Sequence, residues 1–253
     1  MKITFLGTGT SQGVPIICCE CAVCRSQNSK DKRLRSSILI ESDNAKVVID
    51  SGPDFRQQML RIGIKTLDAV VFTHEHKDHI AGLDDIRPIN YLQKKIISVY
   101  ADVSVQQALQ REYPYIFSKD YPGVPLIQIH SIDENHSFEI QGKLWQPIRV
   151  MHMNMPVLGF RIEDLVYITD ANYICDEELE KCKNAKVLVL NALHHQKHYS
   201  HFNLEEALEI VERIQPKRTF FTHISHHMGL IDEINSRLPV SVSLAYDGMS
   251  IEI

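Results

Sequence analysis

Residues 69–80 read Ala-Val-Val-Phe-Thr-His-Glu-His-Lys-Asp-His-Ile, and this stretch indicates the kind of fold. Its apolar, β-branched start predicts a buried strand from Ala69 to Phe72. Alternate side chains of an extended chain share a face, so His74 and His76 can point toward one metal ion. If a helix then begins, Asp78 and His79 turn toward a second position nearby. Ligand-type side chains at this spacing predict two adjacent cations at a strand end.

A solvated polar loop is the alternative interpretation of this segment, and it is the usual one for an isolated histidine. Four ligand-type side chains within six residues favour the metal site. The chain contains 13 histidines in all, so further nitrogen ligands are at hand.

The composition is that of a globular protein with a sizeable core. The chain has 253 residues, 44% of them hydrophobic, and a formal net charge of -5. Residues 1–253 are expected to form one domain, because no linker, repeat or low-complexity tract divides them. The charge balance predicts no broad cationic surface, and hence no stable nucleic-acid complex. With no secretory signal and no run long enough to cross a bilayer, we expect no membrane association and a cytoplasmic location.

Apolar alternation and helical spacing divide the chain into two similar halves. Helices are expected at Asp54 to Ile62, Asp102 to Glu112, Glu177 to Lys181, after the cap pair Asn203 and Glu206, and at His227 to Arg237. Strands are expected at Ile3 to Leu6, Ser37 to Glu41, Lys46 to Ile49, Ala69 to Phe72, Ile97 to Tyr100, Leu126 to Ile129, Ser137 to Ile140, Leu144 to Met151, Leu158 to Ile162, Val166 to Ile168, Lys186 to Leu190, Thr219 to Phe221, Val242 to Leu244 and Ser250 to Glu252. This order predicts an α/β fold in which two sheets pack face to face with helices outside.

A second ligand cluster lies near the start of the chain. Cys19, Cys21 and Cys24 supply three soft ligands that can converge on one zinc ion, which takes four ligands in a structural site. The neighbouring Cys18 is one candidate for the fourth position, although adjacent residues chelate one metal awkwardly. The alternative is a set of buried or redox-active thiols. Cys175 and Cys182 are expected to be ordinary core or helix-surface residues.

The segment His74-x-His76-x-Asp78-His79 resembles the hallmark motif of the metallo-β-lactamase superfamily. This resemblance implies a four-layer αββα sandwich with a two-metal site at one edge of the sheets. It assigns His74, His76 and His152 to one metal, Asp78, His79 and His223 to the other, and Asp170 to both. Zinc, manganese and iron all suit such ligands. A hydroxide shared by the two metals is then the expected nucleophile, with Asp78 and Asp170 helping to orient it.

The cysteine cluster and the segment from Thr222 to His226 together resemble the PhnP branch of that superfamily, whose members are phosphodiesterases that act on cyclic ribose phosphates. The resemblance implies that Cys19, Cys21, Cys24 and His226 hold a structural zinc. It also implies that His201 gives a proton to the leaving oxygen. A solvated histidine at a helix entry is the alternative for His201, and His194, His195 and His198 are rival candidates for the proton donor.

The expected function is therefore that of a metal-dependent phosphoric diester hydrolase for small substrates. The alternatives are a tRNA 3′-processing endonuclease, a lactonase or thioesterase of the same superfamily, and a noncatalytic metal-binding scaffold. The apolar stretch from Tyr113 to Val124 is expected to be exposed, as part of a homodimer interface or as a loop that covers the substrate.

Overall fold

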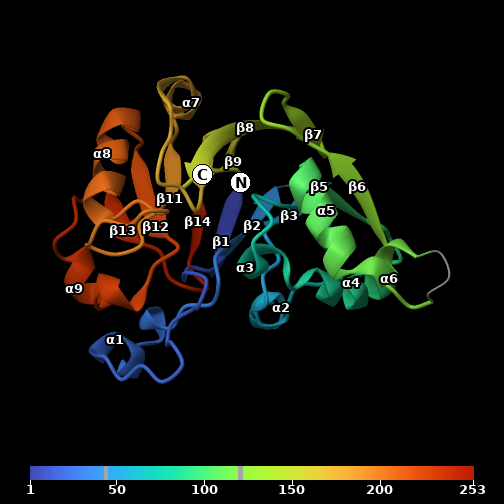
Figure 1. Ribbon diagram of the computed structural model, residues 1–253, viewed down its shortest axis with the longest axis horizontal. Coiled ribbons are helices and arrows are strands. Elements are labelled where there is room, and N and C mark those ends of the chain that lie inside the picture. The colour runs from blue at the N-terminus through green and yellow to red at the C-terminus, as the bar shows by residue number, and fades with distance from the viewer. Residues whose placement is uncertain (43–44, 119–121) are drawn as a thin grey trace.

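The computed structural model describes residues 1–42, 45–118 and 122–253, which form two mixed β-sheets with helices on their outer faces (Figure 1). Within these ranges each sheet has seven strands. The first sheet has the order β14-β1-β2-β3-β4-β5-β6, and the second has the order β13-β12-β11-β10-β9-β8-β7. The strand from the C-terminus, β14, therefore joins the sheet of the N-terminal half.

The N-terminal half supplies six strands to the first sheet, with helices between them. Its strands are β1 (Lys2–Gly7), β2 (Ser37–Ser42), β3 (Ala45–Ile49), β4 (Ala69–Val71), β5 (Ile97–Ala101) and β6 (Ile127–Ser131). Its helices are α1 (Ala22–Arg25), η1 (Ser29–Asp31), α2 (Phe55–Ile62), α3 (Lys77–Ile80), η2 (Leu83–Ile86), α4 (Arg87–Gln93), α5 (Val103–Glu112) and α6 (Pro114–Phe117).

The C-terminal half builds the second sheet and contributes β14 to the first. Its strands are β7 (Phe138–Ile140), β8 (Lys143–His152), β9 (Met155–Ile162), β10 (Leu165–Ile168), β11 (Val187–Asn191), β12 (Arg218–Thr222), β13 (Val242–Leu244) and β14 (Ser250–Glu252). Its helices are α7 (Asp176–Cys182), α8 (Leu204–Ile214), η3 (His226–Met228) and α9 (Ile231–Asn235).

Strand direction brings the functional strand ends to one edge. Strands β3 to β6 are mutually parallel in the first sheet, and β10 to β13 are mutually parallel in the second. Strand β8 pairs antiparallel with β9, which pairs antiparallel with β10, so β8 runs in the same direction as β10. The carboxyl ends of parallel strands meet at the same edge of a sheet, where α/β proteins place their ligands.

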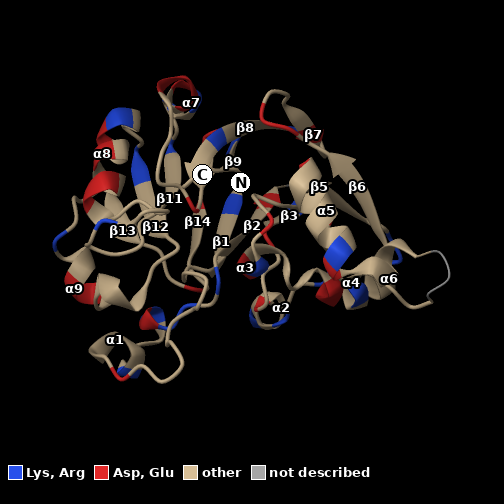
Figure 2. Ribbon diagram, viewed as in Figure 1, with Lys and Arg blue, Asp and Glu red and all other residues tan. Residues whose placement is uncertain are grey.

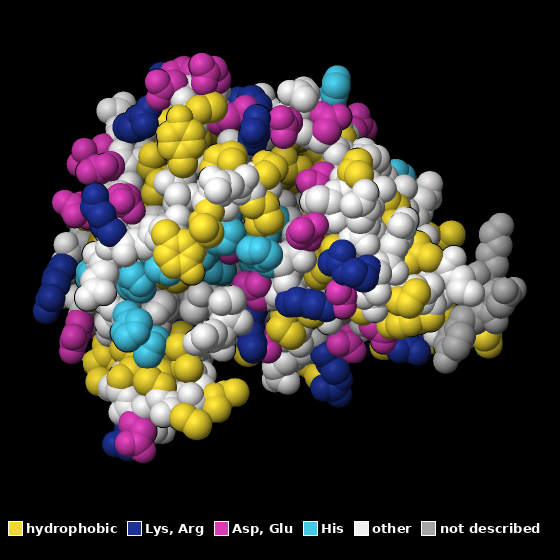
Figure 3. Space-filling view, in the orientation of Figure 1, with side chains coloured by type: hydrophobic (Ala, Val, Ile, Leu, Met, Phe, Trp, Pro, Cys, Tyr) yellow, Lys and Arg dark blue, Asp and Glu magenta, His cyan; other side chains and the backbone are white. Residues whose placement is uncertain are grey.

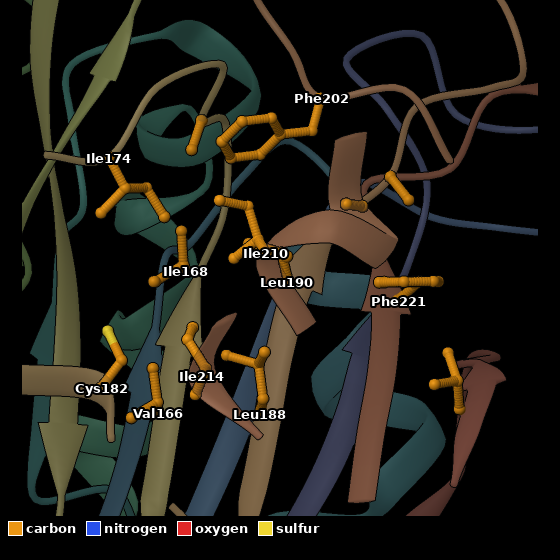
Figure 4. Packing of buried hydrophobic residues seen from close by; sticks show 14 of the residues in the cluster. Val166, Ile168, Ile174, Cys182, Leu188, Leu190, Phe202, Ile210, Ile214 and Phe221 are labelled. Carbon is orange, nitrogen blue, oxygen red and sulfur yellow. The ribbon is translucent and has the colours of Figure 1, made fainter. Parts of the chain in front are cut away.

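Three layers of buried apolar side chains hold the two sheets and the helices together. The central layer lies between the sheets and includes Phe5, Trp145 and Phe160. A second layer packs the first sheet against α2, α4 and α5. The third packs the second sheet against α7, α8 and α9, where Ile210 and Ile214 of α8 meet the outward residues of β10 and β11 (Figure 4). The predicted four-layer αββα sandwich is confirmed.

The strands expected from the sequence all form, and most of their bounds shift by only one to three residues. The main differences concern helices. Short helices α1, α4 and α6 were not expected, and the last two have proline in the first turn. The expected helix from His227 to Arg237 is shorter, because Gly229 has φ +107 and separates η3 from α9. Gly at this φ ends a helical turn readily, since it has no Cβ.

The expectation of an exposed apolar stretch from Tyr113 to Val124 is only partly right in its first part, where Pro114 and Phe117 are exposed. Tyr113 and Ile116 are buried against the first sheet's outer layer. Residues 119–121 of that stretch lie outside the described residues.

Acidic and basic residues are interspersed over the helices in the view of Figure 2, which agrees with the small net charge. None of the helices in the described ranges has both the length and the apolar content that crossing a bilayer requires.

Candidate metal centre

Five strand ends supply the side chains of the centre. Strand β4 leads into His74 and His76, and α3 then carries Asp78 and His79. In the second sheet, His152 ends β8, Asp170 lies two residues after β10, and His223 directly follows β12. Asp50 directly follows β3. The histidine side chains gather near the middle of the face shown in Figure 3.

The seven residues proposed as ligands of two metals lie together. Donor atoms of Asp78, His79, Asp170 and His223 all lie within 4.8 Å of one another. On the other side, the rings of His74 and His76 have centroids 4.7 Å apart, and His76 and His152 have centroids 5.1 Å apart. Asp170 also belongs to a second group with His152 and His201. The carboxylate of Asp170 therefore lies between the two sets of histidines.

Several nitrogen atoms of this cluster are buried and have no hydrogen bond, within the part of the chain that the structure describes. They are Nε2 of His74, Nε2 of His79 and both ring nitrogens of His223. Yet carboxylate oxygens of Asp78 or Asp170 lie between 3.1 and 3.9 Å from nitrogens of these three histidines. The ligand atoms of a metal ion lie close together without bonding to one another, because each directs its lone pair at the cation. The histidine nitrogens and carboxylate oxygens of this cluster fit that description.

Charge in the cluster also fits bound cations. Burial lowers the pKa of His74 well below its ordinary value and lowers that of His223, so both are neutral imidazoles, the form that binds metals. Burial works against the charged form of His79, but Asp170, Asp78 and Asp50 outweigh it and raise its pKa well above the ordinary value. Two buried carboxylates and the partly buried Asp78 around one imidazole are an excess of negative charge that two divalent cations would balance.

Asp50 fixes the orientation of two of these histidines. Its carboxylate accepts hydrogen bonds from His79 Nδ1 at 2.7 Å, from the Thr73 backbone N–H at 2.9 Å and from Thr73 Oγ1 at 2.8 Å. His74 Nδ1 in turn donates to Thr73 Oγ1 at 2.9 Å. Because Nδ1 is the hydrogen-bond donor in both rings, Nε2 is the nitrogen that faces the cluster and is available to a metal ion. His152 is held in the same manner, since its Nδ1 donates to the Ser200 carbonyl at 2.8 Å.

Sequence reasoning missed Asp50. It stands in Ile49-Asp50-Ser51-Gly52, which resembles an ordinary turn after a strand. Its backbone conformation distinguishes it in the structure. Asp50 has φ +64, and the strand-end residues Asp170 and His223 have similar values of +54 and +55. Left-handed backbone at non-glycine residues is uncommon and gathers at functional sites. In the sequence, Asp50, Asp170 and His223 share one signal: each is a polar residue that comes shortly after an apolar strand.

His201, the predicted proton donor, lies against the cluster. Its ring centroid is 4.7 Å from that of His223 and 4.6 Å from that of His152. Burial, followed by the charge of His223, lowers the pKa of His201 to about 3. His201 also stands in one ligand group with His152 and Asp170, so its role as a proton donor stays a prediction. Its rivals His194, His195 and His198 lie farther from the cluster, and only His198 contacts the His201 ring, at 5.4 Å.

The structure brings Cys19, Cys21, Cys24 and His226 into one group. Nδ1 of His226 lies 3.3 Å from Sγ of Cys19, 3.3 Å from Sγ of Cys21 and 3.7 Å from Sγ of Cys24. Cys18 is exposed and lies outside this group. Of the two candidates for the fourth ligand position, the geometry favours His226.

Backbone N–H groups donate hydrogen bonds to the sulfur atoms of two of these cysteines. The backbone N–H of Cys24 donates to Cys21 Sγ at 3.4 Å and is the main reason why the pKa of Cys21 falls to about 6. Burial raises the pKa of Cys24 to about 11, although the Ile16 N–H donates to its sulfur. Three thiols and one imidazole within bonding reach are the donor set of a structural zinc site. The side chains of this group therefore fit a structural zinc ion.

A family model described as "Beta-lactamase superfamily domain" matches residues 45–224, well over half of the chain. These residues contain the whole His-x-His-x-Asp-His segment and the strand ends that carry His152, Asp170 and His223. The chain belongs to the metallo-β-lactamase superfamily. The two mixed sheets with outer helices are the fold of that superfamily.

Among solved structures, a metallo-β-lactamase-fold enzyme titled a new diphosphatase from the PhnP family is similar over 100% of this chain and 97% of its own. Its sequence identity is 38% and its TM-score is 0.93. Zinc-bound PqqB from Methylobacterium extorquens is similar over 100% of this chain and 100% of its own, with 19% sequence identity and a TM-score of 0.79. This likeness concerns the fold alone. The chain is thus related to a PhnP-family hydrolase.

A curated protein from Porphyromonas gingivalis (strain ATCC BAA-308 / W83) has the name octanoyltransferase. It is 40% identical over 252 residues, which make up 98% of this chain and 51% of that protein. The chain therefore spans about half the length of this relative.

Proposed function

We propose that this metallo-β-lactamase-fold protein is a metal-dependent phosphodiesterase that acts on small phosphodiesters. One observation carries the proposal: two sets of ligand-type side chains share Asp170, and the ring of His201 lies against both sets through His152 and His223. A phosphoryl group needs charge neutralisation on its oxygens and a proton for its leaving group. The centre combines residues suited to both tasks.

His74, His76 and His152 would hold one divalent cation, Asp78, His79 and His223 the other, and Asp170 both. Zinc, manganese or iron would supply Lewis acidity toward the phosphoryl oxygens and toward water. Asp50 keeps Nε2 of both histidines free for this task, by a direct hydrogen bond to His79 and through Thr73 to His74. Cys19, Cys21, Cys24 and His226 would hold a third, structural zinc.

His201 is proposed to protonate the departing oxygen. The side chain is 8% exposed, and burial keeps its pKa low in the substrate-free protein. The negative charge of a phosphodiester bound beside it would raise that pKa, because an anion nearby favours the imidazolium form. Substrate binding and protonation of His201 would then support each other.

Relatedness to the PhnP-family diphosphatase supports phosphorus–oxygen chemistry, because that protein is 38% identical and similar over nearly its whole length. The cyclic ribose phosphates expected from the sequence are one class to test. A second candidate, thioester hydrolysis, is favoured by the name octanoyltransferase of the 40% identical relative. That name describes a protein about twice as long.

The first test is hydrolysis of bis(4-nitrophenyl) phosphate by metal-loaded protein. Asp170→Asn should lower kcat/KM by at least about 100-fold, since it removes the charge that both metals share. Asp164→Asn, at an exposed carboxylate on the turn before β10, is the matched control and should behave as the wild type. Equal rates for Asp170→Asn and the wild type would exclude the proposal.

Parallel arms separate the alternatives. A precursor tRNA, a lactone and an octanoyl thioester are offered to the same preparation, and we expect the small phosphodiester to be hydrolysed fastest. A small molecule is thus the proposed partner, without a stable nucleic-acid complex or a membrane. Preferred cleavage of the tRNA or of the thioester would replace the proposal, and metal binding without any hydrolysis would indicate a scaffold. The mass in solution tests the predicted homodimer.

A further inference from the structure

Two hollows flank the metal centre, and their linings differ. The first, here called the histidine pocket, has a volume of about 390 Å³ and is lined by Ser11, Gln12, His194, His198, Tyr199 and His201 among others. The second, here called the methionine pocket, is an open hollow of about 550 Å³ lined by His76, His152, Met153, Asn154, Met155 and Pro156. Both volumes fall in the range of about 300–1,000 Å³ of small-molecule sites.

The two pockets meet at one pair of rings. His201 lines the histidine pocket, His152 lines the methionine pocket, and their ring centroids are 4.6 Å apart. A phosphodiester has two organic groups on one phosphorus atom. If that phosphorus lies at the metal centre, each group has a pocket of its own. The group on the His201 side is the one whose oxygen receives a proton, so the leaving group belongs in the histidine pocket.

The histidine pocket suits an uncharged, hydroxyl-rich group with a flat ring. Its lining offers hydroxyls, an amide and imidazoles, and among the described residues it includes no Lys, Arg, Asp or Glu. The Tyr199 ring stacks on His198 with centroids 4.4 Å apart and planes at 27°. Tyr199 is nevertheless 71% exposed, so its other face is open. An open tyrosine face is a stacking platform for a nucleobase.

The methionine pocket has a different character and a second unusual feature. Met153 and Asn154 form the two-residue turn between His152 of β8 and Met155 of β9. Met153 has φ +57, a conformation that such turns normally fill with Asn or Gly. A bulky side chain at this φ is strained, and strain of this kind persists mainly where the side chain has a function. The side chain of Met153 is 49% exposed and contributes apolar surface to the pocket.

We propose that the substrate is an acyclic phosphodiester with a nucleoside-type leaving group in the histidine pocket and an apolar retained group in the methionine pocket. This inference rests on the proposed phosphodiesterase function and narrows it. Water adds its oxygen to phosphorus, and the bond from phosphorus to the nucleoside oxygen breaks. The proton from His201 goes to that oxygen, and water gives up a proton in return. The products are a nucleoside and the phosphate monoester of the apolar alcohol.

A cyclic ribose phosphate fits this arrangement less well, because its two ester oxygens belong to one molecule and cannot fill two pockets. The linings also argue against further phosphate groups. Neither pocket, in the part of the chain that the structure describes, carries a Lys or Arg that would neutralise one.

The test uses uridine 5′-hexyl phosphate, whose two ester oxygens are both primary alkoxides of similar leaving ability. Mass spectrometry of the products should show uridine and hexyl phosphate. Hexanol and uridine 5′-phosphate as main products would overturn the orientation. The value of kcat/KM should exceed that for uridine 2′,3′-cyclic phosphate by at least about tenfold, and the reverse preference would overturn the acyclic substrate class.

Variants test each pocket separately. Tyr199→Ala should raise KM for the uridine ester by about tenfold, within the range that loss of base stacking produces. Tyr91→Ala, at a tyrosine that is 63% exposed on α4, is the matched control and should leave KM unchanged. An unchanged KM in Tyr199→Ala would contradict the stacking platform.

Met153→Gly relieves the strained turn and removes the apolar side chain. We expect an unchanged or higher Tm together with a KM for the hexyl ester at least about threefold higher, because the lost contact is apolar. Leu144→Ala, at an exposed leucine of β8, is the control. A merely structural Met153 would leave KM unchanged, and that result would overturn the assignment of the methionine pocket.

Different results would exclude the phosphodiesterase function and the two-pocket substrate. If metal-loaded protein does not hydrolyse bis(4-nitrophenyl) phosphate, the phosphodiesterase function is wrong. If it does hydrolyse that ester but prefers the cyclic phosphate or releases hexanol, only the two-pocket inference is wrong.

Discussion

Asp50 contacts no other member of the proposed ligand set except His79, yet it controls how two metal-facing histidines are oriented. It accepts a hydrogen bond from His79 Nδ1 directly. It also accepts one from Thr73 Oγ1, which in turn accepts a hydrogen bond from His74 Nδ1. Asp50→Ala removes these acceptors, and both rings become free to turn. We expect metal affinity to fall by about 10- to 100-fold, as is usual when the hydrogen-bond partner of a ligating histidine is lost. Competition with a chromophoric chelator measures it.

Asp247→Ala is the matched control for Asp50. This carboxylate is also buried and accepts hydrogen bonds from Thr8 and from the Leu34 backbone, but it lies outside the ligand groups. Its replacement should lower the Tm and leave metal affinity as it was. If both variants lose metal equally, the effect of Asp50 comes from general destabilisation and the orienting role is wrong.

At the scale of residues, physical reasoning from the sequence predicted the ligands that are adjacent in the chain. The ligands that lie far apart in the chain were predicted only from the resemblance to the superfamily. His74, His76, Asp78 and His79 are adjacent, so strand geometry and the following helix suffice to bring them together. His152, Asp170 and His223 are separated by many residues, and only the family motif related them before the structure was known. Asp50 was missed because a single Asp before Ser51 and Gly52 resembles a turn.

Among the elements, helix α8 positions the segment that contains His201. Asn203 caps it: the side chain accepts a hydrogen bond from the Glu206 N–H at 2.8 Å, and the Glu206 carboxylate accepts one from the Asn203 N–H at 3.1 Å. This cap pair was predicted and is confirmed. Asn203→Ala should destabilise the protein by about 1 kcal/mol, which corresponds to a Tm lower by about 3 °C.

Calorimetry of three variants checks this cap. Asn203→Ser and Glu206→Gln keep the two reciprocal hydrogen bonds, so their Tm should be close to that of the wild type. A Tm for Asn203→Ala equal to that of Asn203→Ser would show that the cap contributes nothing measurable.

The loop before α1 is an element whose order should depend on metal. Cys19→Ser removes one of four converging donors, so we expect zinc content to fall by about one ion per chain and the Tm to fall by several degrees. Cys18→Ser is a close control, because Cys18 is adjacent in sequence, exposed and outside the group. It should retain its zinc. Loss of zinc in both variants, or in neither, contradicts the four-residue site.

Strands were easier to predict than helices for a physical reason. Strands such as β10 and β11 are short runs of Val, Ile and Leu buried on both faces, and such runs are distinctive. Helices α4 and α6 have 7 and 4 residues, too few for helical periodicity to develop. They form because they pack against the first sheet, and such tertiary contacts cannot be read from a short stretch of sequence.

For the whole molecule, the central feature is that both halves contribute to one centre. The first sheet supplies four ligands from a single segment, and the second supplies His152, Asp170 and His223 from three strand ends. Cations bound there would cross-link the two sheets. This arrangement explains why the site lies at the edge of the sheets.

The most direct measurement is the metal content of the purified, metal-loaded chain, compared with that of Asp170→Ala. We expect about three divalent ions per chain, two in the shared centre and one at the cysteines. Asp170→Ala should keep the ion at the cysteines and lose one or both of the others together with hydrolysis of bis(4-nitrophenyl) phosphate. A wild-type chain that holds a single ion and still hydrolyses this ester at full rate would contradict the account.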